Sequence, residues 1–115
     1  MRQDSQAAQR QTETVGMLEN WTHPAFVQQL NTSFTLEHES LGTISLELVS
    51  VSDLRETPRQ RIFSILFRGP LETPLQQGTF ALKHAALGNT SLFLVPVARE
   101  TDGIHYEAVF NQLVK

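Results

Sequence analysis

The chain has 115 residues, a length typical of one domain with a single hydrophobic core. Its net charge is −3, and the Lys and Arg side chains are too scattered to neutralise phosphates, which argues against nucleic-acid binding. The absence of cysteine excludes disulfides and thiolate zinc sites, and no apolar run reaches the ~18 residues of a membrane span.

Residues 1–16 are polar and rich in Gln, with no apolar pattern around which a fold would form. We expect this stretch to be a flexible extension; a helical extension is the alternative, because Gln, Ala and Arg tolerate helix. Met17 is an alternative start, and residues 17–115 are expected to form a single β-domain. The N-terminus lacks the apolar segment of a secretion signal, so we expect a cytoplasmic protein.

One short helix is predicted within residues 17–30. Thr22 is suited to cap its N-terminus, and Pro24 falls in the first turn, where a missing N–H is harmless. Phe26 and the leucine four residues later form an apolar stripe. We expect this helix to pack on a sheet or close one end of a barrel, with Trp21 as an anchor. A helix that docks on a partner is the alternative.

An eighteen-residue stretch occurs twice without a gap, at 34–51 and again at 80–97, which are 46 positions apart. Such a repeat indicates two copies of one structural unit. Ten positions are identical: Phe34/Phe80, Leu36/Leu82, His38/His84, Leu41/Leu87, Gly42/Gly88, Ser45/Ser91, Leu46/Leu92, Leu48/Leu94, Val49/Val95 and Val51/Val97.

Each copy is predicted to contain three strands. Residues 34–39 alternate between apolar and polar, which is the pattern of a half-buried strand, and Gly42 marks the tight turn that follows. The alternation slips near Val49, which predicts a bulge or a barrel corner, and Pro96 in the second copy requires a sheet edge or a bulge. The third strand of the first copy, 61–68, is apolar on both faces and is therefore expected to be central in the sheet or covered on both faces.

Segments 31–68 and 78–111 are thus expected to form two three-stranded units. A single such unit leaves an apolar face and two edges exposed. Packing the second copy on the first about a pseudo-two-fold axis covers both. We therefore predict an all-β fold with one short N-terminal helix: a six-stranded antiparallel barrel, or a sandwich with opened edges, with the barrel favoured by the predicted bulges.

The C-terminal half carries a distinctive motif: IF-x3-F-x-GP at 62–70, GTF-x-L-x-H-x2-LG at 78–88, LFLVPV at 92–97 and Y-x-AVFN at 106–111. Together with MLENW at 17–21, this motif resembles a family of small bacterial proteins classed as a domain of unknown function. The resemblance covers about residues 17–111. Members of that family are often encoded beside tail-collar proteins of phage-like particles, which implies a structural or assembly role. The resemblance implies no catalytic or binding residue.

The equivalent histidines His38 and His84 are the candidate site residues. If the two-fold axis brought them together, they would ligate a metal, with Glu39 or another carboxylate as a third ligand. The second copy has Ala85 at the position of Glu39, so the carboxylates of such a site would come from one copy only. The simpler interpretation is that each imidazole hydrogen-bonds the backbone of its own turn.

No catalytic motif is present, so we expect no enzyme, no catalytic residue, no bound metal and no cofactor. The sequence predicts a structural or protein–protein interaction module with a protein partner or a homo-oligomer, within a phage-tail-like assembly if the resemblance holds. Phe93, Val95 and Val97 point outward in the prediction and would form a patch that binds a partner, unless residues 17–30 cover it. A small-ligand carrier or a metal-binding barrel is the alternative, although six strands generally leave room only for side chains.

Overall fold

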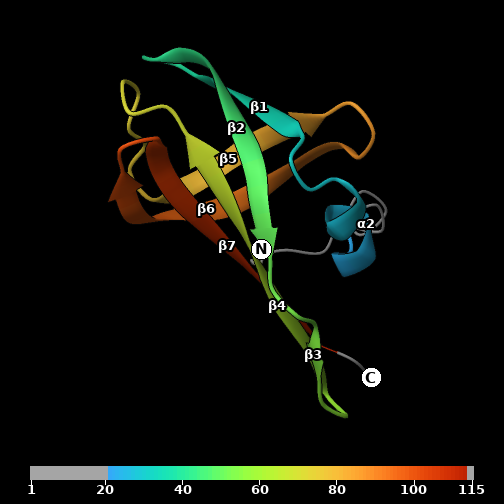
Figure 1. Ribbon diagram of the computed structural model, residues 1–115. Coiled ribbons are helices and arrows are strands. Elements are labelled where there is room, and N and C mark those ends of the chain that lie inside the picture. Colours follow the sequence, from blue (N-terminus) through green and yellow to red (C-terminus); the bar gives the residue numbers. More distant parts are fainter. Residues whose placement is uncertain (1–20, 114–115) are drawn as a thin grey trace.

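The computed structural model describes residues 21–113, which form one helix and seven strands (Figure 1). The elements are α2 (His23–Gln28), β1 (Ser33–His38), β2 (Gly42–Val51), β3 (Arg55–Glu56), β4 (Gln60–Gly69), β5 (Gly78–His84), β6 (Gly88–Glu100) and β7 (Gly103–Leu113). The expected extension, residues 1–16, lies outside the described residues. No helix within residues 21–113 is long and apolar enough to cross a membrane.

The strands form one antiparallel sheet that closes on itself. Their order is β2-β1-β5-β6-β7-β4, and the additional pairing of β4 with β2 completes the ring, while β3 pairs with β4 on the same side as β2, opposite β7. The predicted six-stranded antiparallel barrel is therefore confirmed. Its ring lies in the upper part of Figure 1, and β3 projects below it with the adjoining ends of β4 and β7.

Each repeat forms the same meander, β1–β2–β4 in the first copy and β5–β6–β7 in the second. The two meanders meet through β4 and β7, whose pairing sets Ile65 opposite Ala108, and through β1 and β5, whose register is centred on Leu36 and Leu82. Both contacts therefore join equivalent strands in antiparallel pairs, as a pseudo-two-fold axis requires. Each copy closes the edges that the other leaves open.

Both predicted irregularities are present. The register of β2 on β4 shifts between Leu48 and Ser50, and that of β6 on β7 shifts between Pro96 and Ala98. An extra residue in one strand bends that strand and increases its local twist. Bends of this kind allow a sheet of only six strands to close.

The short strand β3 was not predicted. Its pairing of Arg55 with Ile62 corresponds to the pairing of Ala98 with His105 in the second copy, so β3 is the counterpart of the last residues of β6. The difference between the copies is the three-residue interruption at 52–54, where the second strand of the first copy leaves the ladder. Because of this interruption, equivalent residues of the two copies are 46 positions apart before it and 43 positions apart after it.

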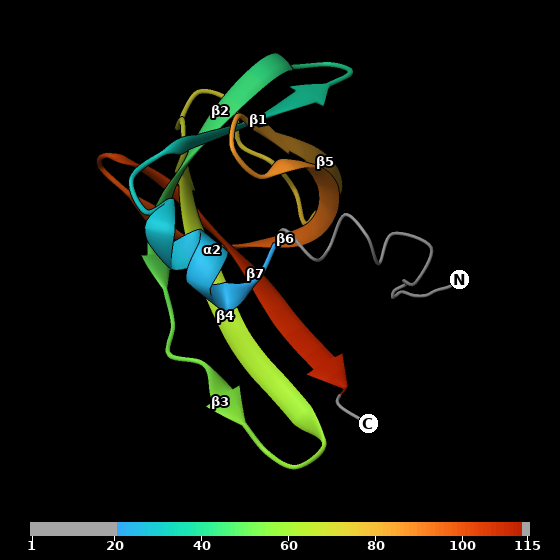
Figure 2. The same ribbon diagram turned by 90° about the vertical axis from the view of Figure 1, so that its right-hand side faces the viewer.

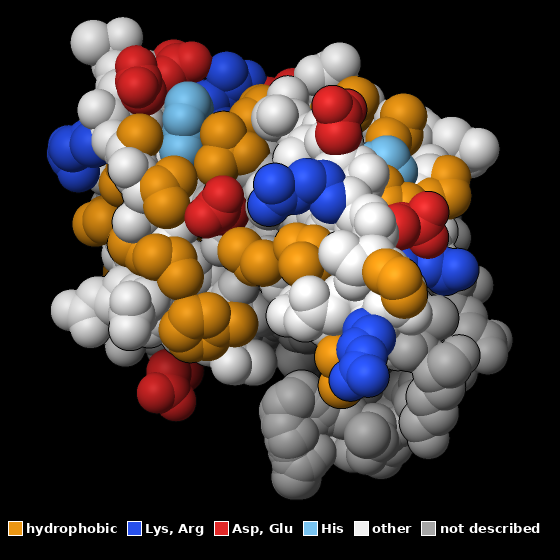
Figure 3. Space-filling model, turned by 90° about the horizontal axis from the view of Figure 1, so that it is seen from below, with side chains coloured by type: hydrophobic (Ala, Val, Ile, Leu, Met, Phe, Trp, Pro, Cys, Tyr) orange, Lys and Arg blue, Asp and Glu red, His pale blue; other side chains and the backbone are white. Residues whose placement is uncertain are grey.

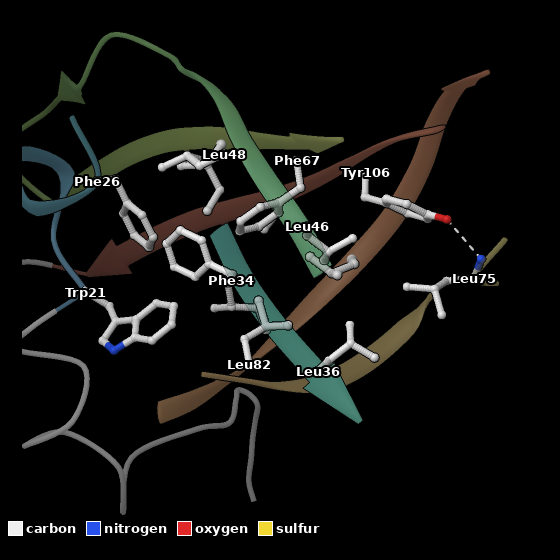
Figure 4. Close-up of a cluster of buried hydrophobic side chains, with 14 of the residues drawn as sticks. Trp21, Phe26, Phe34, Leu36, Leu46, Leu48, Phe67, Leu75, Leu82 and Tyr106 are labelled. Atoms are coloured by element: carbon white, nitrogen blue, oxygen red, sulfur yellow. Dashed lines mark hydrogen bonds between the residues drawn. The ribbon is translucent and has the colours of Figure 1, made fainter. Parts of the chain in front are cut away.

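The barrel interior is filled by side chains from all six strands (Figure 4). Phe34, Leu46 and Phe67 are fully buried near the middle, and the helix α2 adds Phe26 at one end. Thr22 caps α2 by accepting a hydrogen bond from the Ala25 backbone N–H at 3.3 Å, as predicted. Figure 2 shows α2 lying across this end of the barrel, so the expected end-closing role of the helix is confirmed.

The other end of the barrel is closed by the linker between the copies, residues 70–77, which contains no helix or strand. Leu75 is buried, and its backbone N–H donates to the Tyr106 hydroxyl at 2.9 Å, the bond drawn in Figure 4. The linker therefore does more than join the two copies, because it satisfies the one polar atom that Tyr106 brings into the core.

Candidate functional site

The two equivalent histidines make the same hydrogen bonds to the turns that follow them. His38 Nδ1 accepts hydrogen bonds from the backbone N–H groups of Ser40 and Leu41, both at 3.1 Å. His84 Nδ1 accepts from Ala86 at 3.0 Å and Leu87 at 3.2 Å. The predicted role of each imidazole, holding the turn that follows it, is therefore confirmed. Each turn is completed by a glycine with positive φ, 80° at position 42 and 82° at position 88.

The environment of His84 leaves no nitrogen lone pair free for a metal. Because Nδ1 accepts from two N–H groups, the neutral ring carries its proton on Nε2. The Nε2–H donates to the Thr32 hydroxyl oxygen, with 2.9 Å between nitrogen and oxygen, and this hydroxyl donates to the Gln29 carbonyl at 2.7 Å. Burial lowers the pKa of His84 below its ordinary value of 6.5, which favours this neutral form.

His84 also connects the second-copy turn to the end of α2. Gln29 is the C-terminal cap residue of that helix, so the chain of bonds runs from the turn through His84 and Thr32 to the helix end. The sequence did not predict this link, since no local pattern relates position 32 to position 84. Within residues 21–113 no group of three or more His, Asp or Glu side chains is placed to hold a metal ion.

The described part of the N-terminal segment, which begins at Trp21, contacts the turn of the second copy. The indole Nε1–H of Trp21 donates to the Leu87 carbonyl at 2.9 Å, and Leu87 is 8% exposed. The equivalent Leu41 is 38% exposed. Trp21 itself is buried and packs edge-on against Phe26 and Phe34, so its predicted role as an anchor is confirmed. Two turns of nearly the same sequence thus have different surroundings.

Arg68 is the centre of the main ion-pair cluster in the described part of the chain. It extends from β4 to Glu47 on β2, and its second guanidinium nitrogen lies 3.0 Å from Asp102 in the turn between β6 and β7. The hydrogen bond and charge of Glu47, followed by those of Asp102, raise the pKa of Arg68 further above its ordinary value. The cluster links β2, β4 and the turn between β6 and β7, and we assign it a structural role.

Exposed apolar side chains lie on the outer face of β6 and β7. Phe93 is 53% exposed and Val109 63% exposed, while Val95 is half-buried. Val95 opposes Glu107, and Val109 lies two residues further along β7, so both valines are on the same outer face. Val97, at the bulge, is also exposed. We call Phe93, Val95 and Val109 the outer patch.

The described residues of the N-terminal segment do not cover the outer patch. Trp21 and Phe26 are instead buried in the core at the barrel end, and residues 17–20 lie outside the described part. Figure 3, which views the molecule from the end where β3 projects, shows hydrophobic side chains in several groups among charged ones, with the largest gathering on the left of that view. The outward position predicted for Phe93 and Val97 is confirmed, and Val95 is less exposed than expected.

These features define a small closed β-barrel, built from an internal repeat and sealed by its N-terminal segment and its linker. The chain belongs to the family described as a domain of unknown function, DUF6916, whose model matches residues 21–110. The comparison with curated proteins finds no match, and neither does the comparison with solved structures.

Proposed function

We propose that this barrel is a non-enzymatic protein–protein interaction module that binds its partner through the outer patch. The observation that carries the proposal is the exposure of Phe93 and Val109 on adjoining strands of a rigid sheet. Apolar side chains that gather on one face, with polar neighbours around them, are characteristic of protein-binding surfaces. A phenylalanine half out of water is also the kind of residue that contributes strongly to such binding.

The interior of the barrel supports this proposal over a ligand carrier. Phe34, Phe67, Leu46 and Leu82 are each fully buried inside the ring, and both ends are closed by side chains of the same chain. A six-stranded barrel has room for these side chains and little else. The contacts of His84 likewise disfavour the metal-binding alternative, because both of its ring nitrogens are already engaged.

The resemblance noted in the sequence suggests the setting for such a module, a phage-tail-like assembly in the cytoplasm. In that setting the protein would act as a structural or assembly component. The closed barrel suits this role, because a rigid scaffold holds exposed side chains in place without loss of conformational entropy on binding.

Site-specific photo-crosslinking in the source cells tests the proposal. A photoreactive phenylalanine analogue at Phe93 is compared with the same analogue at Ser45, an exposed outward position on β2. We expect a discrete protein adduct at position 93 and none at position 45. Equal labelling at the two positions, or none at either, would contradict the proposal. A small molecule that copurifies with the protein and appears in its native mass spectrum would favour the carrier instead.

A further inference from the structure

The last part of β7 forms a sheet edge. Residues 108–113 pair with residues 60–65 of β4 on one side. On the other side, β6 pairs with β7 only as far as Glu107; the first half of β6 pairs with β5 and has no partner on the side of β7 among residues 21–113. Among residues 21–113 no strand continues the sheet beyond this edge. In Figure 2 the end of β7 projects from the barrel with β4 along one side.

The repeat shows what the same segment does when a neighbour is present. Residues 65–69 of β4 correspond to residues 108–112 of β7. In the first copy this segment is a central strand, paired with β2 on one side and with β7 on the other. In the second copy it keeps only the partner from the other repeat. One strand position is therefore filled in the first copy and open in the second.

The open edge lacks the features by which proteins usually prevent edge pairing. From Ala108 to Leu113 the strand has no charged residue, no proline and no bulge. The edge on the far side of the same sheet is different, because β3 consists of Arg55 and Glu56 and is followed by Pro58 and Arg59. Lys or Arg side chains and prolines are the common means of blocking an edge.

We propose that the open edge of β7 pairs with the same edge of a second copy of this chain, antiparallel and about a two-fold axis at Asn111. The proposal deepens and rests on the proposed function, because it identifies a partner for the strand that carries Val109 of the outer patch. The most exposed apolar residues of the strand, Val109 at 63% and Leu113 at 79%, lie two positions on either side of Asn111. In this register each valine therefore opposes the leucine of the other copy.

The second copy is favoured over an unrelated peptide by self-complementarity. An uncharged strand brings no like charges together when it pairs with itself, and both exposed apolar positions gain an apolar partner in one register. The result is one continuous sheet of six strands, in the order β3-β4-β7 from one protomer followed by β7-β4-β3 from the other. Pairing over six residues is a small interface, so we expect a dimer that dissociates on dilution.

Charge substitution at the axis tests this arrangement. Asn111 is exposed, so Asn111→Lys and Asn111→Glu leave the core intact, but each places two like charges face to face in the dimer. Sedimentation velocity should show a concentration-dependent dimer for the wild type and a dissociation constant at least about tenfold higher for either variant. An equimolar mixture of the two, with one of them isotope-labelled, should recover a heterodimer in the native mass spectrum.

Ser45→Lys and Ser45→Glu are the matched controls, because Ser45 is exposed on β2, away from this edge. They should dimerise as the wild type does. A wild type that stays monomeric up to several hundred micromolar overturns the proposal, as does an Asn111→Lys variant with unchanged affinity or a mixture that forms no heterodimer. A monomer that still gives a crosslinked adduct with another protein at Phe93 would remove the dimer and leave the proposed function standing.

Discussion

The pair His38→Ala and His84→Ala tests how the surroundings of two equivalent turns change the contribution of one side chain to stability. Each imidazole accepts two backbone N–H bonds from its own turn with nearly the same geometry. The turns differ in what lies over them. His84 is buried, bonds Thr32 and packs against Phe34, with ring centroids 4.3 Å apart, whereas His38 is more exposed and lies 6.5 Å from Phe80.

The magnitudes follow from these contacts. In His38→Ala the freed N–H groups are exposed and bond water, so the substitution should lower the free energy of unfolding by about 1 kcal/mol. In His84→Ala the Leu87 N–H is left buried without an acceptor, which costs about 1–3 kcal/mol. The lost packing on Phe34 adds about 1 kcal/mol. We therefore expect about 3 kcal/mol for His84→Ala, roughly threefold the effect of His38→Ala.

Urea unfolding measures both variants. The only tryptophan in the sequence, Trp21, is buried against the barrel end, so its fluorescence reports the loss of that packing while far-UV circular dichroism reports the strands. Coincident transitions would justify a two-state treatment. Equal destabilisation by the two substitutions, or a larger effect at His38, would refute the reasoning that cover by the N-terminal segment makes the second turn more important.

Three further predictions concern the same barrel end and the turn between β6 and β7. Burial lowers the pKa of His84, so just below pH 6.5 the unfolded chain binds more protons than the folded chain. The stabilisation by His84 is therefore complete above that pH and is lost as the pH falls. The effect of His84→Ala on the free energy of unfolding should accordingly shrink when urea titrations are run at acid pH. Trp21→Phe removes the donor to the Leu87 carbonyl and should cost about 1–3 kcal/mol, and an unchanged unfolding midpoint would show that the bond contributes nothing. Gly103→Ala should lower the melting temperature measured by calorimetry, because φ is 152° at this position and a Cβ would lie 2.6 Å from the Gly69 carbonyl oxygen. A melting temperature equal to that of the wild type would contradict this close approach.

Much of the fold follows from local sequence, because strand periodicity and turn chemistry act over a few residues. Residues 34–39 alternate as a half-buried strand and form β1, and the Leu-Gly turns close the hairpins with glycines at positive φ. The phase slip at Val49 marks a bulge for the same reason, since a change of face is visible as a change of alternation. The repeat then predicts closure, because one meander cannot cover its own apolar face.

The candidate site was predicted only in part. Sequence identity between the copies predicted that His38 and His84 hold their turns, since the two N–H donors lie only two and three positions after each histidine. It did not predict that Trp21 bonds Leu87, because that contact joins residues 66 positions apart. The open edge at 108–113 was missed as well. The uncharged run there was a visible signal, but it becomes meaningful only when the neighbour of β7 is known.

The sequence by itself determined that this protein consists of two similar β-meanders and where each of them turns. It also determined that the two meanders must close on one another. These properties follow from the alternation of apolar residues and from the internal repeat, both of which are visible in the sequence. The tertiary structure alone decided how the two copies come to differ. Among residues 21–113, Trp21 bonds the turn of the second copy only, and β6 leaves β7 at Glu107 whereas β2 pairs with the corresponding part of β4, so the covered turn and the open strand edge each occur in one copy only. These differences arise from contacts between distant residues, which no local pattern encodes.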